Sequence, residues 1–194
     1  MLHKQLQVLS LALRRLRLPS GIKTGKGTLI RAPFSIPSGI GIEIGINTKI
    51  HVGSTILTIR EHAGIRYQPK IGIGNDVYIG RYIFLAAIGE IRIGDGCVLS
   101  DYVYINDAAH GLHPSAGPIM KQALESKGPI RIGRNCFLGY RAAVLPGVTL
   151  GEGCVVGINA VVTRSFPAHS MLAGVPAKVI RTFDHSTQTW VSVS

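Results

Sequence analysis

Aromatic side chains, cysteines and acidic residues are scarce in this sequence of 194 residues. Aromatic residues make up 6% of the chain and include one tryptophan, so a core built from large rings is not expected. The three cysteines form no C-x-x-C pair and their number is odd, which argues against a disulfide framework and against a cysteine-bound zinc ion. We therefore expect reduced cysteines and a cytoplasmic setting.

The shortage of acidic residues leaves the chain strongly basic. Ten acidic residues against 21 lysines and arginines give a formal net charge of +11. Such an excess favours an anionic partner, which is a nucleic acid, a membrane surface or a phosphorylated ligand. The sequence has no nucleic-acid-binding motif, and its basic residues are scattered rather than interleaved with aromatic ones, so we expect no nucleic-acid partner.

The apolar run at the start of the chain is too short to cross a bilayer. Leucines recur at helical spacing in residues 1–20, the arginines follow them, and Pro19 ends the pattern. A secretory signal would carry its charges before the apolar run. The pattern predicts a basic amphipathic helix over 1–20. This helix either packs on the rest of the protein or on a neighbouring subunit, or makes peripheral contact with an anionic membrane surface.

The most prominent pattern in the sequence is a six-residue repeat. An aliphatic residue, often followed by glycine or another small residue, returns in one phase along much of the chain. In the last block the positions in phase are Ile132, Leu138, Val144, Leu150, Val156 and Val162. A six-residue repeat is typical of a parallel β-helix, in which short strands stack into coils. The sequence therefore predicts an all-β solenoid.

Breaks in this period divide the chain. We expect a helix over 1–20, a repeat domain over 21–181 and a polar C-terminal tail over 182–194 that is poorly ordered apart from Trp190. Inside the repeat domain, residues 61–70 form a short excursion and a two-residue slip falls near 87–90. The longest break, at about 110–130, predicts a loop, and a long loop in a compact domain is commonly functional.

The cysteines share one place in the repeat. Cys97, Cys136 and Cys154 each follow a repeat-starting aliphatic residue by four positions, and the last two are three hexapeptides apart. We expect them to stack on adjacent coils in a slot that prefers a small apolar side chain.

His110 is the leading catalytic candidate because it stands where the repeat gives way to the long loop. A neutral imidazole can take a proton from a hydroxyl or an amine at pH 7, and Asp107 is a candidate to orient it. A structural loop histidine is the alternative. His113 is three residues further on, but the remaining histidines lie at no ligand spacing, so we expect no metal site.

Three basic residues near the end of the repeat domain are candidates for phosphate binding. Lys178 and Arg181 are three residues apart, and Arg164 lies shortly upstream. Such a trio also occurs on a solvated surface, and the residues alone do not decide between the two.

Four segments carry a resemblance to a known family. They are residues 105–110 (INDAAH), 132–140 (IGRNCFLGY), 144–151 (VLPGVTLG) and 173–181 (AGVPAKVIR). With these segments, residues 71–181 resemble the hexapeptide-repeat acyltransferases, most closely the bacterial polysaccharide and sugar O-acetyltransferases. The resemblance implies a left-handed parallel β-helix and a homotrimer with its active sites between subunits.

The resemblance also implies roles for individual residues. His110 matches the general base that activates an acceptor hydroxyl for direct attack on acetyl-CoA, and the 110–129 loop would shape the acceptor pocket. The positions that match acetyl-CoA contacts are Gly139, Tyr140, Ile158, Thr163, Arg164, Lys178 and Arg181.

The expected function is acetyl-CoA-dependent O-acetylation of a sugar in a bacterial capsule, O-antigen or exopolysaccharide, at the inner face of the membrane, without a metal. The acceptor would be a sugar, a nucleotide sugar or a lipid-linked glycan. N-acetylation of an amino-sugar nucleotide is the near alternative, although no βαβ unit precedes the repeats. A γ-type carbonic anhydrase would need three histidines on zinc, and a catalytically silent scaffold is a third class.

Overall fold

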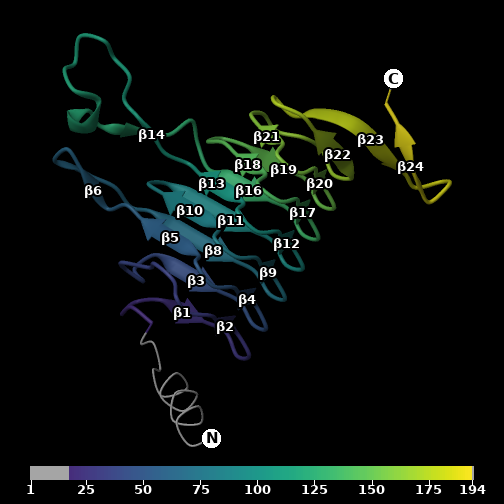
Figure 1. Cartoon of the computed structure of the whole chain (residues 1–194), viewed down its shortest axis with the longest axis horizontal. Coiled ribbons are helices and arrows are strands. Elements are labelled where there is room, and N and C mark those ends of the chain that lie inside the picture. The colour runs from purple at the N-terminus through teal and green to yellow at the C-terminus, as the bar shows by residue number, and fades with distance from the viewer. Residues whose placement is uncertain (1–17, 194) are drawn as a thin grey trace, which may run out of the picture.

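The computed structural model describes residues 18–193, and almost all of its regular structure is β-strand (Figure 1). The predicted N-terminal helix lies almost wholly outside the described residues. Within them the one helix is the short 3₁₀ helix η1 (Ile119–Lys121). No helix between residues 18 and 193 is long and apolar enough to span a membrane.

The chain winds through three parallel sheets, and each coil between residues 42 and 162 gives one strand to each sheet. Sheet A contains, in spatial order, β1 (Lys23–Thr24), β3 (Ile42–Ile44), β8 (Lys70–Ile73), β11 (Glu90–Ile93), β16 (Ile130–Ile132) and β19 (Thr149–Leu150). The parallel part of sheet B contains β2 (Leu29–Ile30), β4 (Lys49–Ile50), β9 (Tyr78–Ile79), β12 (Val98–Leu99), β17 (Phe137–Leu138), β20 (Val155–Val156) and β22 (Ser170–Ala173). Sheet C contains β5 (Thr55–Thr58), β10 (Phe84–Ala87), β13 (Tyr104–Asn106), β18 (Ala143–Val144) and β21 (Val161–Val162).

The six-residue period sets the interior of this solenoid. Ile132 pairs with Leu150 in sheet A, Leu138 with Val156 in sheet B, and Val144 with Val162 in sheet C. Each pair is 18 residues apart, so one coil takes three hexapeptides. These side chains point inward and are at most 3% exposed, because alternate residues of a strand face opposite sides. The predicted left-handed parallel β-helix is confirmed.

The three cysteines form one column of this interior. Each is buried and free, and each Sγ lies 3.1–3.2 Å from a carbonyl oxygen of the following coil. A thiol is small and is a weak hydrogen-bond donor, which suits a slot against a neighbouring backbone. The predicted stacking of Cys136 and Cys154 is confirmed, and Cys97 continues the column.

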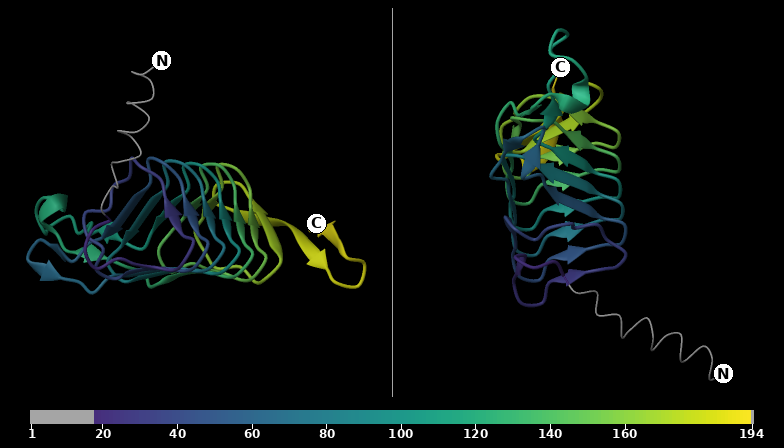
Figure 2. Two further views of the ribbon diagram at one scale, coloured as in Figure 1. Left: turned by 90° about the horizontal axis from the view of Figure 1, so that it is seen from below. Right: turned by 90° about the vertical axis from the view of Figure 1, so that its left-hand side faces the viewer.

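Both long excursions leave the solenoid where the chain passes from sheet C to sheet A, which we call the C–A corner. The first follows β5 and contains the hairpin of β6 (Glu61–His62) and β7 (Ile65–Arg66). The second follows β13 and contains β14 (Ala109–His110), η1 and β15 (Leu124–Glu125). Figure 2 shows the two excursions together at one side of the stack.

The coil between the two excursions has no long excursion of its own. It differs from a regular coil by the predicted insertion of two residues. Ile73 pairs with Ile93, and this separation of 20 residues exceeds the regular spacing by two. The extra residues fall at Ile88 and Gly89, at the same corner. The C–A corner is therefore irregular on three successive coils.

The C-terminal segment corrects one prediction. Residues 182–194 were expected to be poorly ordered, but β23 (Lys178–Asp184) and β24 (Thr189–Ser192) form an antiparallel hairpin that continues sheet B beyond the solenoid (Figures 1 and 2). Phe183 pairs with Trp190, and their ring centroids lie 5.5 Å apart. The polar residues that suggested disorder alternate with apolar ones, which is the pattern of a strand.

Candidate functional site

The long excursion is an ordered loop that places His110 at its base. β14 pairs with β15, so that His110 lies opposite Leu124. Gln122 closes the segment between these strands: its Oε1 accepts from the His113 amide at 3.0 Å, and its Nε2 donates to the carbonyls of His113 and Gly117 at 3.1 and 2.9 Å. The buried Gln122 side chain thus ties the end of the loop to its beginning at His113 and its middle at Gly117.

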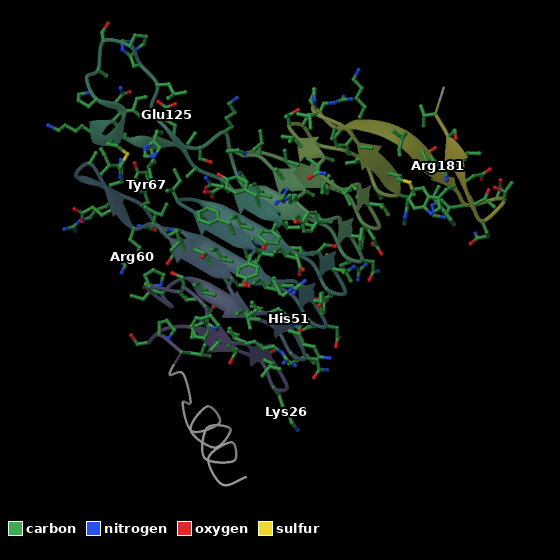
Figure 3. All side chains as sticks on the ribbon, viewed as in Figure 1. Lys26, His51, Arg60, Tyr67, Glu125 and Arg181 are labelled. Carbon is green, nitrogen blue, oxygen red and sulfur yellow. The ribbon has the colours of Figure 1, made fainter. Side chains whose placement is uncertain are left out.

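The shorter excursion supports the longer one. Tyr67 follows β7, and its hydroxyl accepts a hydrogen bond from the Leu124 amide at 2.8 Å and donates to the Leu124 carbonyl at 3.2 Å. A small apolar cluster lies beneath this contact and consists of Ile59, Tyr67, Ile88, Ala108 and Leu124. Figure 3 labels Tyr67 and Glu125, the residue after Leu124, in the same region of the molecule.

The two ring nitrogens of His110 have different surroundings. Nδ1 is buried and has no hydrogen-bond partner in the described structure. Nε2 is not among these buried atoms and forms no hydrogen bond in the described structure, so on this half-buried residue it is the nitrogen that solvent can reach. The ring of His62, from the end of β6, lies edge-on to the His110 ring with 5.4 Å between centroids. The prediction treated His62 as one of several scattered histidines.

Asp107 does not orient His110, contrary to the prediction. Its carboxylate is fully buried and accepts hydrogen bonds from the amides of Ile88 at 2.8 Å and Gly89 at 2.9 Å. Burial raises the pKa of this carboxyl, and the amide hydrogen bonds oppose that rise. Asp107 therefore holds the two extra residues of the neighbouring coil in place, which is a structural task.

His113 is also separate from His110. Its Nδ1 accepts a hydrogen bond from the Ser115 amide at 3.2 Å, so the ring stabilises the turn that follows it. Residues 18–193 contain no group of three or more His, Cys, Asp or Glu side chains placed to hold a metal ion.

Three of the predicted acetyl-CoA contacts share another corner, where the chain passes from sheet B to sheet C. Gly139 and Tyr140 follow β17, and Ile158 follows β20 on the next coil. The Asn159 amide donates to the Tyr140 carbonyl at 2.9 Å, and a Cβ on Gly139 would lie 2.9 Å from the Ile158 nitrogen. Glycine is needed at 139 because the coils approach closely there. Ile158 is 69% exposed.

An aromatic ladder runs along this B–C corner and fixes the Tyr140 ring. Tyr82 stacks on Tyr102 at 5.2 Å, and Tyr102 meets Tyr140 edge-on at 5.5 Å. The Arg141 guanidinium lies 5.1 Å from the Tyr140 ring centroid. Tyr82 and Tyr102 each stand three positions after an inward-facing residue of sheet B, but Tyr140 stands only two positions after Leu138, so the repeat does not predict the ladder.

A β-bulge brings Lys178 and Arg181 to one face of β23. Residues three apart on a regular strand point to opposite faces. Here Lys178 pairs with Ala173 and Arg181 with Met171, and the register shifts between them, so that Ile180 is the additional residue. Ala173 and Met171 share a face of β22, and cross-strand partners lie on the same face. The bulge therefore aligns the two cations.

Thr163 and Arg164 lie at the C–A corner directly after β21, and both are exposed. The Arg164 guanidinium lies 4.9 Å from the Phe166 ring centroid. Within one chain the predicted site residues thus fall into separate places, with His110 at the C–A corner and Gly139, Tyr140 and Ile158 at the B–C corner. Figure 3 shows Arg181 on the C-terminal hairpin, across the molecule from Tyr67.

Comparison with known proteins identifies the class. Residues 129–164 match the family model described as "Hexapeptide repeat of succinyl-transferase". The chain is 35% identical over 169 residues to the Escherichia coli K12 protein named "Putative lipopolysaccharide biosynthesis O-acetyl transferase WbbJ", covering 84% of this chain and 82% of that protein. The chain therefore belongs to the hexapeptide-repeat acyltransferase family, as the sequence motifs predicted.

A second relative is longer than this chain. The Mycobacterium tuberculosis H37Rv protein named "Probable acetyltransferase Rv3034c" is 37% identical over 158 residues, which are 81% of this chain and 48% of that protein. This chain thus spans about half the length of that relative.

Solved structures agree on the fold. AntD, an N-acyltransferase from Bacillus cereus crystallised with dTDP and 3-hydroxybutyryl-CoA, matches with a TM-score of 0.70 at 23% identity, over 86% of each chain. At this level of identity the likeness concerns the left-handed β-helix alone.

Proposed function

We propose that this protein is an acetyl-CoA-dependent O-acetyltransferase that acts on a sugar hydroxyl of a bacterial surface polysaccharide. The observation that carries the proposal is the His110 ring, which presents one open nitrogen at the base of an ordered loop in a member of an acyltransferase family. The name of the Escherichia coli relative supports a polysaccharide substrate. The net charge of +11 suits a polyanionic donor and a phosphorylated sugar carrier.

In the proposed reaction His110 Nε2 acts as the general base. The acceptor hydroxyl gives its proton to Nε2 while its oxygen bonds to the acetyl carbonyl carbon. The carbon–sulfur bond of the thioester then breaks, and the leaving thiolate takes the proton from the imidazolium. Proton and electron pairs balance without a metal or a covalent enzyme intermediate.

We further propose that the active site forms between subunits of a homotrimer. The positions of the predicted residues support this arrangement, because His110 and the Gly139–Tyr140 turn lie at opposite ends of sheet C. Residues so placed meet most simply when the C–A corner of one subunit faces the B–C corner of another. We keep peripheral contact of residues 1–20 with the inner membrane face as one alternative, beside packing of this segment on the protein or on a neighbouring subunit.

Calorimetric titration with acetyl-CoA tests the donor site first. We expect saturable binding that the Lys178→Ala/Arg181→Ala double variant weakens about tenfold or more, because two charge-assisted contacts to phosphate are lost. Lys23→Ala/Lys26→Ala, which removes the same charge from the far end of the solenoid, is the matched control. Absence of binding by a folded, trimeric sample would refute the acetyltransferase proposal.

Mixed oligomers test the shared site. His110→Ala subunits and Lys178→Ala/Arg181→Ala subunits are refolded together in equal amounts and assayed at an acetyl-CoA concentration far too low to saturate the double variant. If each site takes His110 from one subunit and the cations from its neighbour, about a quarter of the sites regain both intact sets. No recovery of activity in a verified mixed trimer would place the whole site in one chain.

N-acylation of an amino-sugar nucleotide is the second candidate, because an imidazole base can take a proton from an amine as well as from a hydroxyl. An acceptor screen with paired hydroxy and amino sugars on nucleotide carriers separates the two. Alkaline hydroxylamine removes an O-acetyl product and leaves an N-acetyl product, so product stability identifies the bond. Acetyl-CoA and 3-hydroxybutyryl-CoA should be compared as donors in the same assay.

A further inference from the structure

Two of the unpartnered buried nitrogens in the described structure belong to neighbouring rings. They are His62 Nε2 and His110 Nδ1, and the only other buried side-chain nitrogen or oxygen without a hydrogen-bond partner between residues 18 and 193 is the Thr58 hydroxyl. Buried polar atoms are nearly always hydrogen-bonded, so each such atom calls for an explanation. The two rings meet edge-on with 5.4 Å between centroids.

His62 is half-buried and stands just before the tight turn of the β6–β7 hairpin. The link between β6 and β7 consists of Ala63 and Gly64, with φ of 49° and 76°, which is the left-handed pair of a tight two-residue hairpin. Beyond β7, Tyr67 binds both backbone groups of Leu124, the residue that pairs with His110. The hairpin is therefore docked against the strand pair that carries His110.

We propose that His62 is the positioning residue of His110, and that its Nε2 accepts a hydrogen bond from His110 Nδ1–H, directly or through one water. The proposal rests on the proposed function, because it assigns His110 as the base. A neutral imidazole has one donor nitrogen and one acceptor nitrogen. A proton held on Nδ1 leaves the lone pair on Nε2, the nitrogen that faces the acceptor.

The acidic residue next to His110 in sequence does not fill this role. Both oxygens of Asp107 accept hydrogen bonds from the amides of Ile88 and Gly89, and neither bonds to His110. His62 comes from a different excursion, and its ring offers a nitrogen acceptor where Asp107 offers none to His110. The imidazole pair therefore sets the tautomer without an ion pair.

Nitrogen-15 NMR of histidine-labelled full-length protein tests the pairing without substrate. The chain has seven histidines, and His110→Ala assigns the relevant signals. We expect His110 to carry its proton on Nδ1 in the wild type and in His62→Gln, whose amide can accept at the same place. In His62→Phe, which keeps the ring shape and removes the nitrogen, we expect a mixture of tautomers. A wild-type His110 protonated on Nε2, or a tautomer unchanged in His62→Phe, would overturn the proposal.

Kinetics then test the consequence. We expect His62→Phe to lower kcat about tenfold to a hundredfold, with an unchanged KM for acetyl-CoA and an unchanged Tm, and His62→Gln to restore most of the rate. In a His110→Ala background His62→Phe should have no further effect, because His62 acts through His110. Equal losses in both backgrounds would contradict the pairing.

The NMR result separates the two proposals. If the tautomer responds to His62 but no sugar is acetylated, the pairing stands and the proposed function falls. If acetylation proceeds and the tautomer ignores His62, the reverse holds. A zinc ion bound by the purified protein and lost in His62→Ala would also overturn the pairing, because the two nitrogens would then be ligands.

Discussion

The regular coils and the C–A corner follow different rules. In the coils over 130–162 each residue repeats the role of the residue 18 positions away, and the interior is a stack of aliphatic side chains with a cysteine column. At the corner, the contacts join segments distant in sequence, such as Tyr67 with Leu124 and His62 with His110. The coils form the repetitive scaffold, and the C–A corner brings together side chains that the repeat alone would not place side by side.

The coil core should show the largest loss of stability. Leu138 is fully buried in sheet B between Leu99 and Val156. We expect Leu138→Ala to lower the free energy of unfolding by about 3 kcal/mol, because a buried leucine leaves a cavity in a stack that cannot collapse. Urea unfolding monitored by circular dichroism measures this loss. Leu124→Ala, in the small apolar cluster at the C–A corner, is the matched variant and should lower the free energy of unfolding by less. An equal loss would show that the corner is as important for stability as the coil core.

Asp107→Asn should come next, at about 1–3 kcal/mol. The carboxylate accepts from two amides, whereas an asparagine side chain has one acceptor oxygen and would turn an N–H toward the second amide. We expect a lower Tm with the kcat of the remaining folded enzyme close to wild type. A large loss of kcat in an Asp107→Asn variant with unchanged Tm would indicate instead that Asp107 contributes to catalysis.

Because the pKa of Asp107 is raised, the effect of Asp107→Asn on stability should depend on pH. Folding favours its protonated form, so the folded state binds more protons than the unfolded state above the ordinary carboxyl pKa. Its contribution to stability is therefore full in acid and falls as pH rises through the folded pKa. We expect the stability difference between wild type and Asp107→Asn to shrink from pH 4 upward, and a constant difference would show an unshifted carboxyl.

Tyr67→Phe should cost about 1 kcal/mol of global stability, less than either change above. It removes one hydroxyl that serves both backbone groups of Leu124. We expect faster amide hydrogen exchange over 109–125 and unchanged exchange over 130–162. At a temperature where both variants are folded, Tyr67→Phe should lower kcat more than Leu138→Ala does. Uniform protection across both regions would mean that the corner does not depend on this contact.

The smallest change is expected at the opposite end of the coils. Lys23 and Glu43 form an exposed ion pair between β1 and β3. Water and salt screen such a pair, so Lys23→Ala should leave Tm and kcat unchanged within error. A measurable loss of activity would indicate that this end of the solenoid contacts substrate or a neighbouring subunit.

The repeat made most of the fold predictable, because the phase of the aliphatic residues states which side chains face inward. The same phase could have corrected the prediction for Asp107. Ile105 and Asp107 are two residues apart on an extended segment, so both face the interior, and a buried carboxylate there must serve backbone amides. Proximity to His110 in sequence was the weaker guide.

The candidate site was predictable only in part. His110 was found because it stands at a break in the period and within a family motif. Its neighbour His62 was not, because no rule of the repeat relates two excursions that start on different coils. The alignment of Lys178 with Arg181 depends on a bulge at Ile180, and a one-residue register shift between strands leaves no mark in the sequence.

A stack of parallel strands has no natural length, since its last rung offers the same unpaired backbone groups as every rung before it. In sheet B the turn after β22 reverses the chain, so that β23 pairs antiparallel with β22 and β24 pairs antiparallel with β23. β23 therefore occupies the edge of β22 that a further coil of sheet B would pair with, and the hairpin projects away from the stack (Figure 2). The hairpin acts as a terminator that keeps a polymer-like architecture from growing into a fibre.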